Sequence, residues 1–216
     1  MSSEDDTRAH RTLDTGRLEA FSDNAFSIAA TLLVLDLAIH PPGTPLEQVL
    51  HAWPEYLAYV VSFLTIGAAW LAHSALTDRL TRTDSMLLRL NLLLLLVVAF
   101  LPFPTRLVAS ALHHEGSERV FVTMYGLSLV AIRVLGFALA AYARRERLYT
   151  PKPDEGELNG GRRELLPAVV GYVLAILIGL AAPGVAVAAY FGLAVYLVLP
   201  LGISHGARSR ARGSRR

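Results

Sequence analysis

Apolar residues in this chain are collected into six long blocks, without the short periodic spacing of an amphipathic helix or strand. Each block has roughly twenty residues, the length that a helix needs to cross about 30 Å of hydrocarbon. The blocks lie near residues 18–39, 54–76, 86–109, 120–143, 165–182 and 185–204. A soluble protein of 23.5 kDa has too little interior to bury them all. The pattern therefore predicts an all-α membrane protein with six transmembrane helices per subunit.

Proline and glycine mark the ends of several blocks. Three prolines and a glycine at 41–45 follow the first block, and the pair Pro183 and Gly184 predicts a tight turn between the last two. The stretch 150–161 is rich in proline, glycine and acidic residues, so it predicts a loop. The chain divides into a polar N-terminal arm at 1–16, a six-helix transmembrane domain at 17–206 and a basic tail at 207–216.

The basic residues are distributed unevenly among the links between blocks. Of the 20 Lys and Arg residues, all but Arg106, Arg119 and Arg133 lie in the N-terminal arm, the second-to-third link, the fourth-to-fifth link and the C-terminal tail, including their flanks. Because positively charged loops stay in the cytoplasm, this distribution predicts six crossings with both termini cytoplasmic. The basic tail follows a membrane helix, which favours contact with anionic lipid headgroups over nucleic acid.

Composition supports a membrane protein and argues against an enzyme. The chain is 53% hydrophobic and 18% charged, and its mean hydropathy is +0.43. It has no cysteine, which excludes disulfides and thiolate metal sites. It also has no His-Glu-x-x-His string, no Gly-x-Ser-x-Gly string and no glycine-rich phosphate-binding loop. We therefore expect neither catalysis nor a bound cofactor.

The first block carries an apolar stripe along one side of the expected helix. With 100° per residue and Ile28 at zero, Leu32 falls at about +40° and Leu35 at about −20°. Ile39 continues this stripe, Arg17 and Asn24 extend it toward the cytoplasm, and Ser27 and Thr31 lie beside it. Such spacing usually marks helix packing or lipid contact. If several copies of the helix surround an axis, however, the same side chains form a narrow apolar collar, which ions cannot pass without losing hydration.

Polar residues near such a collar would act directly on a permeant cation. The hydroxyl groups of Ser27 and Thr31 would replace part of its water shell. Asp36 lies toward the outer mouth, where its charge would raise the local cation concentration.

Asp23 lies about 140° from Ile28, on the reverse side of the same helix. A carboxylate at this depth costs several kcal/mol unless it has partners. Candidate donors are Arg17, Trp70, His73 and Asn91. A structural hydrogen-bond network is the simpler interpretation, and a proton or ion relay is the alternative.

The string Arg17-x-x-x-Phe21-Ser22-Asp23, followed by the run from Phe26 to Asp36, resembles the first-helix signature of the transmembrane protein 175 family. These proteins are the lysosomal potassium channels and their bacterial relatives. Segments that resemble the second and third helices of the family are Trp70 with His73, Leu90-Asn91-Leu92, and the run from Leu101 to Thr105. The six blocks cover the whole chain, as in bacterial members, which resemble a single six-helix repeat.

The resemblance implies a homotetrameric channel domain at 17–206, with each first helix lining a central pore. It implies a potassium-preferring leak channel in a bacterial plasma membrane, with potassium as the permeant ion. No Thr-Val-Gly-Tyr-Gly string occurs, so a backbone-carbonyl filter has no support in the sequence.

The resemblance also assigns residue roles. Ile28, Leu32 and Leu35 match the hydrophobic constriction of the family, and Ser27 and Thr31 match the polar positions next to it, near which a permeant potassium ion would pass. Residues that match its structural network are Arg17, Ser22, Asp23, Trp70, His73 and Asn91. Asn24 departs from the family, which more often has a small residue at that position.

A small secondary transporter is the alternative function, because carriers also hold buried charges such as Asp23 and Arg133 in helix bundles. Against it, the polar groups of the first block flank an apolar stripe and do not form a midplane cup. Arg133 lies near the middle of the fourth block and is either an interhelical tie or a gating charge. A single arginine without a repeated series favours the tie.

Overall fold

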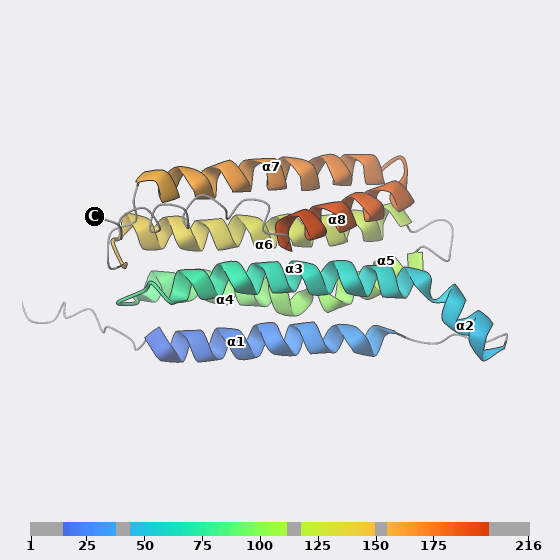
Figure 1. Ribbon diagram of the computed structural model, residues 1–216, viewed down its shortest axis with the longest axis horizontal. Helices are drawn as coiled ribbons and strands as arrows, with labels where there is room; N and C mark the ends of the chain where they lie inside the picture. The colour runs from blue at the N-terminus through green and yellow to red at the C-terminus, as the bar shows by residue number, and fades with distance from the viewer. Residues whose placement is uncertain (1–14, 38–43, 112–117, 150–154, 199–216) are drawn as a thin grey trace, which may run out of the picture.

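The computed structural model describes residues 15–37, 44–111, 118–149 and 155–198, and these residues are almost entirely helical (Figure 1). The elements are α1 (Thr15–Leu32), the 3-10 helix η1 (Leu33–Asp36), α2 (Pro45–His51), α3 (Trp53–Thr77), α4 (Ser85–Phe100), α5 (Pro102–Ala111), α6 (Glu118–Arg145), α7 (Glu155–Gly179) and α8 (Pro183–Val198). An isolated bridge pairs Leu80 with Tyr149.

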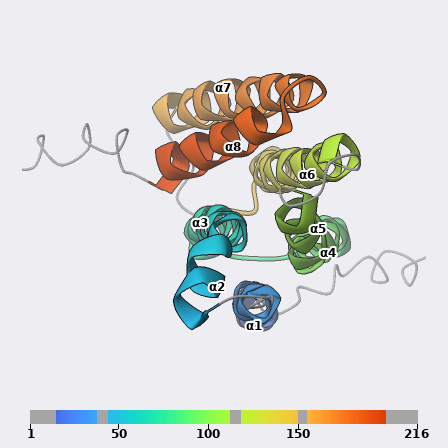
Figure 2. The same cartoon turned by 90° about the vertical axis from the view of Figure 1, so that its right-hand side faces the viewer.

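The long helices lie side by side and nearly parallel or antiparallel to one another (Figure 1). The end-on view in Figure 2 places α1 at one edge of the bundle and α7 with α8 at the opposite edge. α1 packs against α3 and α4, while α6 packs against α4, α5 and α7. α1 is therefore a peripheral helix, with only one side covered by its own subunit.

Four segments are long and apolar enough to cross a membrane: Thr15–Leu35, Trp53–Thr77, Ser85–Ser110 and Arg119–Arg145. Two shorter apolar helices follow, Leu166–Gly179 and Pro183–Leu197. The protein is thus an all-helical membrane protein with four long apolar helices and shorter ones, which confirms the predicted class. A full count of six crossings stays a prediction.

Three predicted boundaries differ from the structure because of local backbone chemistry. The first block is not one continuous α-helix, since α1 ends at Leu32 and tightens into η1 before residues 38–39, which lie outside the described part. The third block breaks at Leu101, because Pro102 has no backbone N–H to donate to an α-helical partner. The expected loop at 150–161 is helical from Glu155 onward, where acidic residues favour a helix N-terminus.

The prolines after the first block predict the end of a helix, but Pro45 is also the first residue of the short helix α2. Proline fits that position because its fixed backbone angle suits a helix and its missing N–H is not needed there. Thr44 caps the helix by accepting a hydrogen bond from the Glu47 backbone N–H, while Glu47 accepts one from Thr44 N at 2.9 Å. α2 follows the first membrane segment in the chain.

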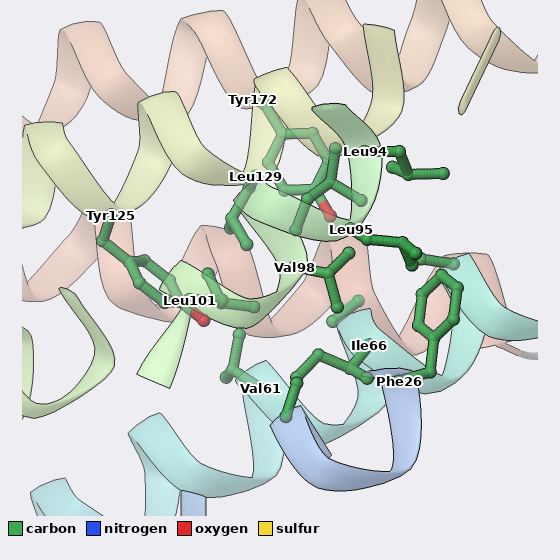
Figure 3. Packing of buried hydrophobic residues seen from close by; sticks show 14 of the residues in the cluster. Phe26, Val61, Ile66, Leu94, Leu95, Val98, Leu101, Tyr125, Leu129 and Tyr172 are labelled. Atoms are coloured by element: carbon green, nitrogen blue, oxygen red, sulfur yellow. The ribbon is translucent and has the colours of Figure 1, made fainter. Parts of the chain in front are cut away.

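A continuous apolar core joins the helices (Figure 3). Phe26 of α1 packs toward Ile66 of α3, and Val98 of α4 and Leu129 of α6 belong to the same cluster. All four are no more than 2% exposed. This core fixes which side of α1 faces inward and which side stays uncovered.

Candidate functional site

The inward side of α1 follows a regular helical spacing. Its buried residues are Leu18, Ser22, Phe26 and Ala29, and Leu33 of η1 continues the same side. Intervals of three and four residues keep these side chains on one face, which packs against α3 and α4.

The opposite side of α1 and of η1 carries the apolar stripe of Ile28, Leu32 and Leu35. Their side chains are 57%, 42% and 74% exposed, respectively, in the subunit. Arg17, Asn24, Ser27 and Thr31 are exposed as well. The structure therefore brings the predicted constriction residues and their polar neighbours together on the uncovered side of one helix. Asp36 ends η1, and its side chain lies outside the described part.

Thr31 donates its hydroxyl hydrogen to the backbone oxygen of Ile28 at 2.9 Å. This bond leaves the lone pairs of the Thr31 oxygen available as acceptors. A hydroxyl oxygen on an exposed helix side next to aliphatic residues is suited to contact a partly dehydrated cation.

Behind the stripe, a chain of hydrogen bonds joins α1, α3 and α4. Asn91 Nδ2 donates to Ser22 Oγ at 2.9 Å, and Ser22 Oγ donates to the Leu18 backbone oxygen at 2.8 Å. His73 Nε2 lies 2.8 Å from Asn91 Oδ1. Because an amide oxygen only accepts, His73 Nε2 carries the hydrogen. All three side chains are buried, at 4% exposure or less.

Two further contacts hold α1 against α3. Trp70 Nε1 donates to Asp23 Oδ1 at 2.9 Å, and the rings of Phe26 and His73 lie 5.4 Å apart. Asp23 is therefore paired on the flank of α1, away from the stripe. Arg17 is exposed, and no hydrogen bond joins it to these side chains within the described part of the chain.

Sequence reasoning missed a second buried polar cluster. Ser62 of α3 lies 2.8 Å from Thr105 of α5 and 2.8 Å from the Tyr125 hydroxyl of α6. Tyr190 of α8 donates to the Val122 backbone oxygen at 3.2 Å, and its ring packs edge-on against Tyr125. The available signal was the hydroxyl residues that interrupt otherwise apolar blocks, since such groups need partners inside a membrane.

The two charges of the carrier hypothesis lie apart. Asp23 contacts Trp70 of α3, whereas Arg133 of α6 lies near the Tyr172 hydroxyl of α7. α1 and α7 occupy opposite edges of the bundle (Figure 2). Across residues 15–37, 44–111, 118–149 and 155–198, no group of three or more His, Asp or Glu side chains could hold a metal ion.

Comparison with known proteins identifies close relatives. The family described as "Endosomal/lysosomal potassium channel TMEM175" matches residues 17–102. A potassium channel of Streptomyces collinus is 37% identical over 187 residues, which cover 85% of this chain and 91% of that protein. An endosomal/lysosomal proton channel TMEM175 of Gallus gallus is 36% identical over 117 residues, which cover 49% of this chain and 23% of that protein.

Two solved structures are similar to this chain. The crystal structure of a lysosomal potassium-selective channel TMEM175 homolog from Chamaesiphon minutus has 32% identity and a TM-score of 0.74, and the match covers 85% of this chain and 95% of that chain. A variant of the potassium channel MtTMEM175 has a similar fold, with a TM-score of 0.55 at 19% identity and coverage of 89% and 92%.

Proposed function

Since this chain belongs to the TMEM175 family, whose members are ion channels and not enzymes, we propose that it is a potassium-preferring cation channel of the leak type. Potassium is named as the permeant ion of the Streptomyces collinus relative, which the chain matches over nine-tenths of its length. α1 helices of four subunits surround the pore, and their apolar stripes form the constriction.

The uncovered stripe of α1 is the observation that carries this proposal. Ile28 of α1 and Leu35 of η1 are 57% and 74% exposed, whereas the opposite side of α1 packs against α3 and α4. An aliphatic ring of this kind resists ion passage by excluding water, and it needs no titratable residue. Thr31 and Ser27 lie beside the stripe and offer hydroxyl oxygens to the ion.

The hydrogen bonds behind α1 support a structural role for the network. Asp23, Ser22 and Asn91 find partners on neighbouring helices of the same subunit and point away from the stripe. Such a network holds the rotation of α1, and so the direction of Ile28, without conducting anything itself.

The separation of Asp23 and Arg133 favours a channel over the carrier alternative. A carrier that uses both charges needs them around one midplane cavity. Here one lies between α1 and α3 and the other between α6 and α7. Uptake that saturates and depends on a proton gradient would instead support the carrier.

The position of the basic residues supports an orientation in a bacterial plasma membrane with both termini cytoplasmic. Arg79 and Arg82 lie in the α3–α4 link and Arg145 ends α6, at the same end of the bundle as the start of α1 (Figure 1). Arg106 and Arg119 lie toward the other end. This asymmetry is the one that positive loops impose on multi-pass proteins.

The experiment is planar-bilayer recording of the purified protein, with potassium on one side and sodium on the other. Unitary current steps and a reversal potential that favours potassium are expected. Ile28→Asn should wet the constriction and raise unitary conductance about fivefold, the effect of lowering a barrier by about 1 kcal/mol. Leu177→Asn is the matched control, because Leu177 of α7 is also 57% exposed but lies at the edge opposite α1.

Unchanged conductance in Ile28→Asn, or an equal increase in Leu177→Asn, would show that the stripe is not the constriction. Smooth saturable flux without unitary steps would overturn the channel itself.

A further inference from the structure

Arg133 occupies an unusual position for a charged residue. It lies near the middle of the membrane segment Arg119–Arg145 and is partly buried. Its Nε and Nη2 atoms are shielded from solvent and have no hydrogen-bond partner among the described residues. A charged guanidinium at this depth is costly unless an opposite charge or several acceptors compensate it.

Tyr172 lies next to this arginine, and its hydroxyl also lacks a well-formed hydrogen bond. Its side chain is fully buried, and its hydroxyl lies close enough to the guanidinium for electrostatic interaction. The described residues supply no hydrogen-bond partner for this hydroxyl that satisfies both distance and angle. The Tyr172 hydroxyl also lies near Thr65 of α3, but neither Thr65 nor Arg133 forms a bond of full hydrogen-bond geometry with it. Two guanidinium nitrogens and one hydroxyl in the region between α6 and α7 are thus left without a well-formed hydrogen bond among the described residues.

The helices around Arg133 offer no carboxylate at its depth. α6 packs against α3, α4, α5, α7 and α8. Acidic residues in these six helices occur only toward their N-terminal ends, namely Glu55, Glu118, Glu155, Glu157 and Glu164. Glu164 precedes Tyr172 by two helical turns, about 12 Å along the axis. Among the residues that the structure describes, the neighbouring helices therefore place no acidic residue at the level of Arg133.

The missing partner must be small, anionic and able to accept hydrogen bonds. Water satisfies N–H donors but leaves the charge uncompensated. A lipid phosphate lies about 15 Å from the middle of the hydrocarbon, too far to reach this depth. The full burial of Tyr172 also leaves no room for a bulky organic anion.

We propose that Arg133 and Tyr172 form a binding site for a small monovalent anion, of which chloride is the test case. The anion accepts hydrogen bonds from Arg133 Nε and Nη2 and from the Tyr172 hydroxyl. It neutralises the guanidinium and ties α6 to α7. The site lies away from α1, so it is independent of the proposed pore.

The test measures thermal unfolding of the purified protein in detergent at constant potassium concentration and ionic strength, with gluconate replaced stepwise by chloride. A saturable rise in Tm of about 2–4 °C is expected, since a ligand that binds only the folded state stabilises it. Bromide should act as chloride does. In Arg133→Gln and Tyr172→Phe the chloride-dependent rise should be lost or strongly reduced, whereas Arg119→Gln, at the exposed start of α6, should keep it.

Identical unfolding in chloride and gluconate would overturn the proposal, as would an equal chloride effect in Arg133→Gln, which would mark a general salt effect. If both variants fail to fold, crystals of the unaltered protein grown in bromide give the answer. An anomalous bromide peak beside the Arg133 guanidinium supports the site, and its absence at a bromide concentration that saturates the Tm effect rejects it.

Discussion

α1 and α6 both carry polar groups at membrane depth, but these groups differ in whether they have hydrogen-bond partners. In α1, Ser22 and Asp23 are matched by Asn91 and Trp70 of the same subunit. In α6, Arg133 has two shielded donor nitrogens without partners among the described residues. The outer side of α1 is also unmatched, because Ile28 and its neighbours face away from the bundle.

Some polar groups thus find hydrogen-bond partners within one subunit, whereas others have no partner among its described residues. Groups that are satisfied internally rigidify the fold. Exposed aliphatic side chains are expected to contact other molecules, and a buried charge is expected to bind a counter-ion. We propose that neighbouring subunits cover the stripe and that an anion neutralises Arg133.

The largest loss of stability is expected for a substitution at the centre of the hydrogen-bond network behind α1. Asn91→Leu removes the acceptor of His73 and the donor to Ser22. His73 Nε2–H is then buried without a partner, at a cost of about 1–3 kcal/mol, while Ser22 keeps only its bond to the Leu18 backbone oxygen. We expect a large loss of folded protein, measured as the yield and Tm of the purified oligomer. Asn24→Leu makes the same replacement on the exposed side of α1 and should leave Tm nearly unchanged. Equal Tm values for the two variants would contradict a stabilising role for the bonds of Asn91.

The next largest effect is expected where α6 packs against α7 and α8. A Cβ atom at Gly126 would overlap the Tyr190 hydroxyl and lie 2.5 Å from Ile176 Cγ1. Gly126→Ala should therefore destabilise the protein by about 1–3 kcal/mol, seen as a lower Tm. Gly136→Ala, in the same helix, is the control because its added Cβ meets no atom within 4 Å. A stable Gly126→Ala variant would mean that this packing is loose.

Much of the helical arrangement could be predicted from the sequence, because apolar blocks of membrane length are a strong signal. The third expected span coincides with the segment Ser85–Ser110, but the sequence analysis did not predict that Pro102 divides it into α4 and α5. It also did not predict that Pro45 begins α2. The change to 3-10 geometry at Leu33 has no comparable marker in the sequence.

For the candidate site, helical periodicity placed Ile28 opposite the core and Asp23 on another side, because both lie within regular α1. Pairing was harder to predict, since it depends on how helices pack. The donors proposed for Asp23 included Arg17, yet Trp70 makes the bond. Periodicity also could not indicate that the Arg133 nitrogens lack partners, which depends on neighbours distant in sequence.

A smaller effect is expected at the edge of the α1 network. Asp23→Ala leaves Trp70 Nε1 without its acceptor, but Trp70 is 40% exposed, so the cost should be about 1 kcal/mol. The expected result is less assembled protein, measured by size-exclusion yield, with unitary conductance unchanged in the channels that form. Asp23→Asn keeps an acceptor oxygen and should restore most of the yield. A conductance change that persists in Asp23→Asn would instead support the relay interpretation.

The smallest effect is expected at α2, where Thr44→Ala removes the N-terminal cap of this helix. Backbone amides of α2 should exchange with solvent roughly threefold to tenfold faster, while those of α1 stay unchanged. The bond from Thr44 N lowers the pKa of the Glu47 carboxyl, so its contribution is present at neutral pH and is lost as pH falls through that lowered pKa. Acid should therefore mimic Thr44→Ala within α2. If exchange in α1 also rises, the stability of α1 depends on α2 as well as on the hydrogen bonds behind the stripe.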